Sequence, residues 1–316
     1  MKTTVDWFRF RTLSNPYETL EAIRPAFGTA ADLLTLEEGG KGKDGWESRK
    51  VLRMAGDLTL GYIDHGGDSQ RGWLRFDLPG SGCEWVQDWP YVAGTNGRLD
   101  TAEVRRIDLA LTVFDGSVTH EKVLEAHSKG DFSCGGRSPK LKQITGSDPK
   151  DGRTVYVGAR ESEKFVRCYE KGYELLAKHK VPEWIKKSAN QLYYDGVGTV
   201  DIDKLYRCEV EFKASATKVL PWTMITNGDA YFAGANPFFA SLLPGAKERR
   251  IQTMPDFGPK VALQVQAENL RKAYGGVIKA LMESYNDDAD FVIKMLTADA
   301  PSERLIKDGV LTVLHH

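Results

Sequence analysis

The residues best suited to chemistry lie in three segments that alternate between apolar and polar side chains: 106–111, 165–171 and 207–213. Successive side chains of a β-strand point to opposite faces, so each segment would place its polar residues on one face. In 106–111 and 207–213 the other face is apolar and is expected to be core. The shared polar face would collect Arg106, Asp108, Arg167, Tyr169, Lys171, Arg207, Glu209, Glu211 and Lys213.

This set of side chains is typical of phosphoryl-transfer chemistry. Converging carboxylates suit a hard divalent cation such as Mg²⁺ or Mn²⁺, and we expect Asp108, Glu209 and Glu211 to be its ligands. A tyrosine beside cationic groups can act as a nucleophile, and a metal with basic side chains would stabilise charge on a phosphorus atom. A polar outer face is also the ordinary state of one antiparallel strand, but three strands in the same phase favour a site.

Tyr169 is the expected nucleophile, with Arg167 and Lys171 beside it on the same face. A phenol has a pKa near 10, so its oxygen needs nearby positive charge to act as a nucleophile at neutral pH. From the strand phase alone, a tyrosine half-packed on the sheet is an equally good interpretation.

The elements that would position these residues predict an α+β fold with a mostly antiparallel sheet and helices on one face. Helical spacing over about 260–285, and shorter helical patterns near 288–298 and 301–307, predict a smaller helical C-terminal part. Residues 133–153 are rich in Gly, Ser and Lys and are expected to be mobile. We therefore expect an α+β domain at 1–216 and a helical region at 217–316.

The composition is that of a globular protein. The chain has 316 residues, of which 41% are hydrophobic and 28% charged, which excludes a disordered or fibrous chain. We find no run of about 18 apolar residues and no signal-peptide pattern at the N-terminus, so we expect a cytoplasmic protein without a membrane partner. The spacing of the four cysteines fits neither a disulfide framework nor a zinc site.

Charge is distributed unevenly along the chain. The net charge is −1, yet residues 137–187 carry 13 Lys/Arg against 7 Asp/Glu. The middle of the chain is therefore the place to look for a polyanion, although a solvated lysine-rich surface is about as well supported by charge alone.

Four segments together resemble the rolling-circle replication initiation factors of filamentous phages and Gram-positive plasmids. They are RRIDLAL, FSCGGRSPK, TVYVGARESEKFVRCYEKGYEL and YRCEVEFK, and the resemblance covers about residues 1–215. The ordered skeleton T-x-Y-x-G-x-R-x-S, then R-x-Y-x-K, then R-x-E-x-E-x-K is its most specific part.

The resemblance implies a DNA strand transferase that nicks one strand at an origin and keeps the 5′ end as a phosphotyrosine. Residues 1–216 would then be the nicking or strand-transfer domain, and 217–316 would serve as a cap, in dimerisation or in origin recognition. The family's nucleophile motif falls on Arg167, Tyr169 and Lys171. The implied partners are origin DNA with a single-stranded nick site, a second copy of the chain and a host helicase. The basic residues expected to contact this DNA are Arg106, Lys140, Lys142, Arg160, Arg207 and Lys213.

The sequence leaves several alternatives open. Thr112 stands where the family often has a second acid, which leaves the exact metal ligands undecided. Tyr173 is a second candidate nucleophile, ranked below Tyr169. A non-catalytic DNA-binding protein of the same fold is the main functional alternative. A glycosidase using Glu209 and Glu211 is less favoured, because two acids on one strand do not easily flank a sugar.

Overall fold

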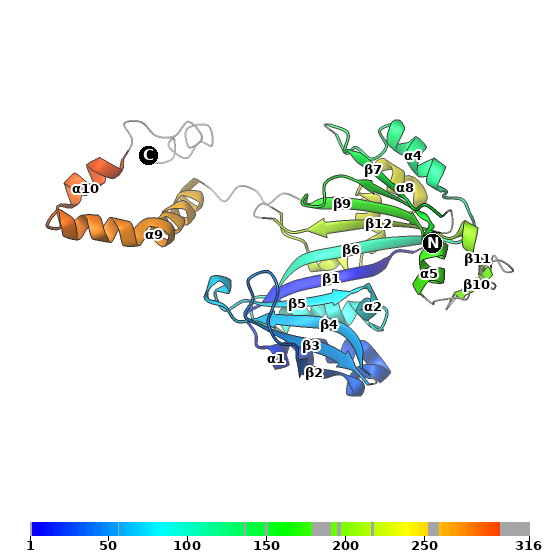
Figure 1. Cartoon of the computed structure of the whole chain (residues 1–316), viewed down its shortest axis with the longest axis horizontal. Helices are drawn as coiled ribbons and strands as arrows, with labels where there is room; N and C mark the ends of the chain where they lie inside the picture. Colours follow the sequence, from blue (N-terminus) through cyan, green and yellow to red (C-terminus); the bar gives the residue numbers. More distant parts are fainter. Residues whose placement is uncertain are drawn as a thin grey trace. The chain divides into compact units, whose positions relative to one another are not determined.

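The computed structural model describes residues 2–55, 57–135, 137–148, 151–178, 191–194, 197–215, 218–251 and 259–297. Its centre is a ten-stranded sheet in which every paired strand is antiparallel to its neighbour, in the order β2-β3-β4-β5-β1-β6-β12-β9-β8-β7 (Figure 1). The strands are β1 (Thr4–Thr12), β2 (Thr35–Glu38), β3 (Ser48–Met54), β4 (Leu58–His65), β5 (Leu74–Pro79), β6 (Glu103–Val113), β7 (Leu141–Thr145), β8 (Arg153–Val157), β9 (Lys164–Glu170) and β12 (Tyr206–Lys213).

One face of this sheet is apolar and the other is polar, as alternation along the strands requires. In β6, Ile107, Leu109 and Leu111 are buried in the core, and β12 contributes Cys208 and Val210 to the same cluster. The helices with side chains in that core are α1 (Pro16–Ile23), η1 (Arg24–Leu33), α2 (Gly80–Cys83), α3 (Trp89–Ala93), α4 (His120–Ser128), η6 (Trp222–Met224), α7 (Gly228–Ala233) and α8 (Pro237–Leu242). The predicted fold class is confirmed.

The N-termini of two of these helices follow from local sequence. The Asn15 side chain accepts hydrogen bonds from the backbone of Tyr17 and Glu18, and the Glu18 carboxylate accepts one from the Asn15 amide, which forms a capping box ahead of α1. The Thr119 hydroxyl caps α4 by accepting a hydrogen bond from the backbone of Lys122.

The end of β9 differs from the prediction. The strand-like segment was expected to reach residue 171, but the strand ends at Glu170 and helix α5 (Lys171–Lys178) begins at the next residue. A small hairpin of β10 (Gln191–Tyr194) and β11 (Gly198–Asp201) and the turn η5 (Ile202–Lys204) complete this end of the sheet. Leu175 of α5 packs there with Val200 and Leu205 in a separate small core.

The segment 133–153, which we expected to be mobile, contains the edge strand β7, which the sequence analysis did not predict. Four of the five β7 residues are exposed, and edge strands commonly carry polar and charged side chains.

The chain forms two compact units, Met1–Gln252 and Thr253–His316. The first unit runs past the expected boundary at 216, because the segment 220–243 contributes Phe232, Phe238 and Phe239 to the sheet's core. A functional division at 216 stays a prediction. The second unit contains α9 (Pro259–Ser284) and α10 (Ala289–Leu296), close to two of the predicted helices, whereas the helix expected at 301–307 lies outside the described residues.

Candidate active site

Tyr169 lies near the end of β9 on the polar face of the sheet and lines a cavity of about 830 Å³. Its strand pairs with β12 so that Tyr169 is directly opposite Arg207 and Arg167 is directly opposite Glu209. This register brings Glu209, diagonal to Tyr169, within reach of its hydroxyl. The cavity is walled by α5, η5, β8 and the start of α2.

The Tyr169 hydroxyl donates a hydrogen bond to Glu209 Oε1 over 2.6 Å. Arg167 binds the other oxygen of the same carboxylate through Nε, at 2.6 Å, and through Nη2. Burial and the negative charge of Glu209 raise the pKa of Tyr169 well above its usual value. We expected the basic neighbours to favour the phenolate, but here Arg167 pairs with Glu209, so the tyrosine stays protonated and the carboxylate is its proton acceptor.

Lys171 meets Tyr169 although it belongs to α5 and not to the strand. Its Nζ lies 3.5 Å from the Tyr169 hydroxyl and forms an ion pair of 2.9 Å with Glu174. Burial and the charge of Arg207 lower the pKa of Lys171. Lys171 thus lies beside the Tyr169 hydroxyl, and Arg167 is linked to that hydroxyl through Glu209.

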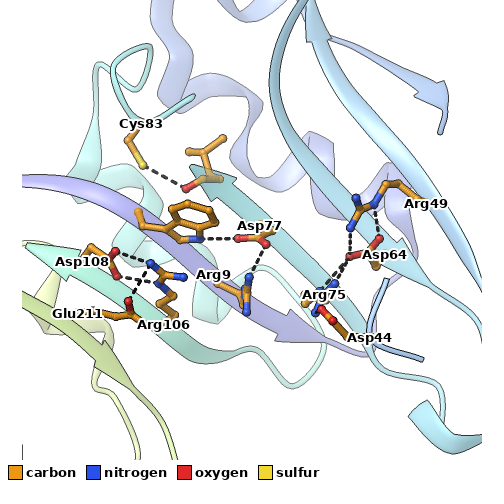
Figure 2. Close-up of polar contacts among 12 residues, drawn as sticks. Arg9, Asp44, Arg49, Asp64, Arg75, Asp77, Cys83, Arg106, Asp108 and Glu211 are labelled. Carbon is orange, nitrogen blue, oxygen red and sulfur yellow. Dashed lines mark hydrogen bonds and ion pairs between the residues drawn. The ribbon is translucent and has the colours of Figure 1, made fainter. Parts of the chain in front are cut away.

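The three acids expected to bind metal share one face, since Glu211 is directly opposite Asp108 and Glu209 lies two residues along the same strand. All three line a smaller cavity of about 100 Å³, which shares Arg167 and Tyr156 with the larger one. Arg106 binds both oxygens of Asp108, at 2.6 and 2.8 Å, and lies 3.2 Å from Glu211 (Figure 2).

These carboxylates do not fit a divalent ion as they are arranged here. Guanidinium groups hold the oxygens of Asp108 and Glu209 that an ion would bind, and the Glu211 carboxylate lies near both Arg106 and Lys213. No group of three or more acidic, histidine or cysteine side chains is placed to hold a metal within the residues that the structure describes. Burial raises the pKa of Asp108 to about 7, although Arg106 opposes that rise. Mg²⁺ or Mn²⁺ binding therefore stays a prediction.

Asp6 is a site residue that the sequence analysis missed. Counting back from the core residues Phe8 and Phe10, strict alternation would point Asp6 into the core. A β-bulge between Val5 and Trp7 leaves Asp6 unpaired in the ladder, and its carboxylate binds Arg207 at 2.9 Å and lines the large cavity. Bulges redirect side chains in this way beside functional sites.

The residues expected to contact DNA fall into two groups. Arg207 is buried and bound to Asp6 and to the Thr112 hydroxyl, and Arg106 is bound to acids, so neither guanidinium faces solvent freely. The others lie at the surface or rim of the site: Arg160 lines the small cavity, Lys213 lines a third cavity, Lys140 and Lys142 are exposed, and Lys142 is opposite Tyr156.

Tyr173 of α5 also lines the large cavity. Its hydroxyl donates to Asp203 over 2.6 Å, and this hydrogen bond raises the pKa of Tyr173 to about 12. Lys171 contacts Tyr169 and not this hydroxyl. The two tyrosines therefore differ in the groups that contact their hydroxyls, which are Glu209 and Lys171 for Tyr169 and Asp203 for Tyr173.

The fold and part of the sequence are similar to those of known proteins. The fold is that of a rolling-circle replication initiator from Geobacillus stearothermophilus, with a TM-score of 0.50, 17% sequence identity and coverage of 78% of this chain and 85% of that one. No curated protein matches the sequence.

Residues 102–254 match the family model described as replication initiation factor, and this confirms the predicted resemblance. Residues 102–254 are thus similar in sequence to replication initiation factors, and the fold is similar to that of a rolling-circle replication initiator. The matched segment contains Asp108, Arg167, Tyr169, Lys171 and both glutamates of β12, but not β1 with Asp6. Among the described residues, no helix is long and apolar enough to cross a membrane.

Proposed function

We propose that the protein nicks one DNA strand at a replication origin and rejoins it, with Tyr169 as the nucleophile. The observation that carries the proposal is the Tyr169 hydroxyl, which opens on a cavity of about 830 Å³ and is held by a carboxylate at 2.6 Å and an ammonium at 3.5 Å. The family match supports a role in replication initiation.

The transfer proceeds by exchange of one phosphodiester bond for another. The Tyr169 oxygen attacks the phosphorus atom and passes its proton to Glu209, while the bond from phosphorus to the 3′ oxygen breaks and that oxygen takes a proton from water. The 5′ phosphate stays on the tyrosine. Because one phosphodiester replaces another, the attack of a 3′ hydroxyl on the phosphotyrosine reverses the step and rejoins the strand.

The surrounding charges suit this chemistry. Lys171 lies beside the attacking oxygen and offsets the negative charge that it gains when its proton leaves. Arg167 keeps the Glu209 carboxylate aimed at the hydroxyl by binding its second oxygen. Burial and the charge of Asp6 raise the pKa of Glu209, which makes it a stronger proton acceptor than an exposed glutamate.

The test is adduct formation with supercoiled DNA that carries the cognate origin, in buffer with Mg²⁺ or Mn²⁺. Wild-type protein should form a covalent protein–DNA adduct, and Tyr169→Phe should form none while binding the DNA with unchanged affinity. Tyr62→Phe is the matched control, since Tyr62 is a tyrosine of β4 that does not line the cavity. It should form the adduct at the wild-type rate.

Two outcomes would contradict the proposal. An adduct from Tyr169→Phe that disappears in Tyr173→Phe would transfer the role to Tyr173. Origin binding without any adduct from the wild-type protein would favour the alternative, a non-catalytic DNA-binding protein of the same fold.

A further inference from the structure

A third cavity, of about 330 Å³, lies beyond the site and carries an excess of positive charge. Among the described residues, five cationic side chains and one carboxylate line it: Lys164, Lys213, Lys218, Arg249, Arg250 and Glu163. The start of β9, the end of β12, the end of α7 and the segment that follows α8 contribute to its lining.

Three of the five cations have partners in the protein. Lys218 pairs with Glu163 at 2.6 Å, Lys213 pairs with Glu211 at 2.8 Å, and Lys164 donates to the carbonyl of Ala235. The side chains of Arg249 and Arg250 are exposed and make no hydrogen bond or ion pair within the described residues. Two guanidinium groups at one cavity are thus available to an anion.

The backbone that carries these arginines is held in place. The Arg249 amide donates to the Ala230 carbonyl over 2.9 Å. Gly234 approaches so closely that a Cβ at this position would lie 1.9 Å from the Arg249 carbonyl oxygen, so only glycine fits there. A positioned backbone with unpaired guanidinium groups is a better anion site than a chain of solvated lysines.

The third cavity neighbours the small cavity at Lys213. The large and small cavities share Arg167 and Tyr156. Lys213 of the third cavity binds Glu211 and the carbonyl of Arg160, and both of these residues line the small cavity. Along β12, Lys213 lies six residues from the position opposite Tyr169, or about 20 Å at the rise of a strand.

Aromatic rings line the small cavity. Tyr156 and Phe165 lie with their ring centroids 5.3 Å apart, and Trp7 lines the same small cavity. Nucleic-acid bases stack on such rings, and neighbouring cationic side chains bind the phosphates.

We propose that the cavity containing Arg249 and Arg250 binds the phosphate backbone of single-stranded DNA, about 20 Å along the sheet from Tyr169. The inference rests on the proposed function in that the bound strand is the one that reaches Tyr169. A single strand is the occupant, because its unpaired bases can stack on the rings of Trp7, Tyr156 and Phe165, which line the neighbouring small cavity.

The experiment measures the affinity of the full chain for a fluorescein-labelled oligothymidylate of about 16 nucleotides, the upper end of single-strand site sizes, by anisotropy. All variants carry Tyr169→Phe, so cleavage does not enter the measurement. The test variant is the double substitution Arg249→Ala with Arg250→Ala. The control removes the same charge with Lys41→Ala and Lys247→Ala, since both lysines are exposed and neither lines the cavity.

The test variant should bind roughly 25-fold more weakly at about 0.1 M salt, and its salt slope should fall by about 1.4, the release expected for two phosphate contacts on a single strand. The control should keep the affinity and the slope. Equal losses in the two doubles, or no loss in either, would overturn the inference, as would a matched duplex that binds more tightly and shows the same loss. Failure of Tyr169 as nucleophile would appear only in the adduct assay and would leave this comparison intact.

Discussion

At the scale of single residues, the pairing of Tyr169 with Glu209 decides how the proposed nucleophile would be activated. The 2.6 Å hydrogen bond places a buried carboxylate where it can take the phenol's proton. Glu211 lies on the same face two residues further along but contacts Arg106 and Lys213 instead. The two glutamates therefore have different partners, although the sequence presents them as equivalent.

Glu209→Gln should lower the rate of adduct formation by roughly 10²–10⁴-fold, because the amide cannot accept the proton, while DNA affinity stays the same. Glu211→Gln should lower the rate of adduct formation much less. The rates are measured in single turnover with each variant in excess over the DNA. If the two substitutions lower the rate of adduct formation equally, the two acids act together, as metal ligands would. The proposed role of Glu209 as proton acceptor would then be wrong.

At the scale of elements, α4 carries a buried histidine at its first turn, beside the strands that bear the site. His120 is 2% exposed, and its Nδ1 lies 3.4 Å from the Tyr206 hydroxyl of β12. Burial, and then the charge of Arg153, lower the pKa of His120. The folded state therefore binds this proton less readily than the unfolded chain, in which a histidine titrates near pH 6.5.

The sign of the pH effect follows from that difference. The stability contributed by neutral His120 is present above about pH 6.5 and is lost as the pH falls through the lowered pKa of the folded state. His120→Asn should remove part of the loss of stability below pH 6.5, as measured by urea unfolding between pH 5 and 8 (roughly the range in which histidines titrate). His127→Asn, on the same helix, is the control and should keep the pH dependence; the same curve from wild type and His120→Asn would contradict the prediction.

At the scale of the whole molecule, the first compact unit needs the segment that follows β12. Phe232 and Phe239 stack with their ring centroids 4.2 Å apart, and both are fully buried in the core of the sheet. Each large apolar side chain buried in this way contributes about 1.5–3 kcal/mol, so losing these two together with Met224 and Leu220 removes much of a typical domain's stability.

A chain ended after Gln252 should therefore unfold cooperatively with a melting temperature close to that of the full protein. A chain ended after residue 216 should be insoluble or lack a cooperative transition. Circular dichroism melts of the two truncated proteins test this. A 1–216 fragment as stable as the 1–252 fragment would show that α7 and α8 are not needed for folding and would support the boundary expected from sequence.

The alternation of side chains along each strand, which the sequence contains by itself, determined which residues form the core of the sheet. The phase of β6, β9 and β12 correctly separates Ile107, Leu109 and Val210 from the polar face, because a strand can place only every second side chain in the core. Cap residues likewise determined where α1 and α4 begin. These features depend on neighbouring residues alone.

The tertiary structure decided which polar groups meet. Strand phase does not determine the register of β9 on β12. This register lets the Tyr169 hydroxyl donate a hydrogen bond to Glu209. It also pairs Arg167 with Glu209, a carboxylate that was expected to bind metal. Asp6 joins the site only through a bulge in β1, a distortion of pairing that alternation does not reveal. Tyr169 and Glu209 are 40 residues apart in sequence, and Arg207 and Asp6 are 201 apart, so only the folded sheet brings these partners together.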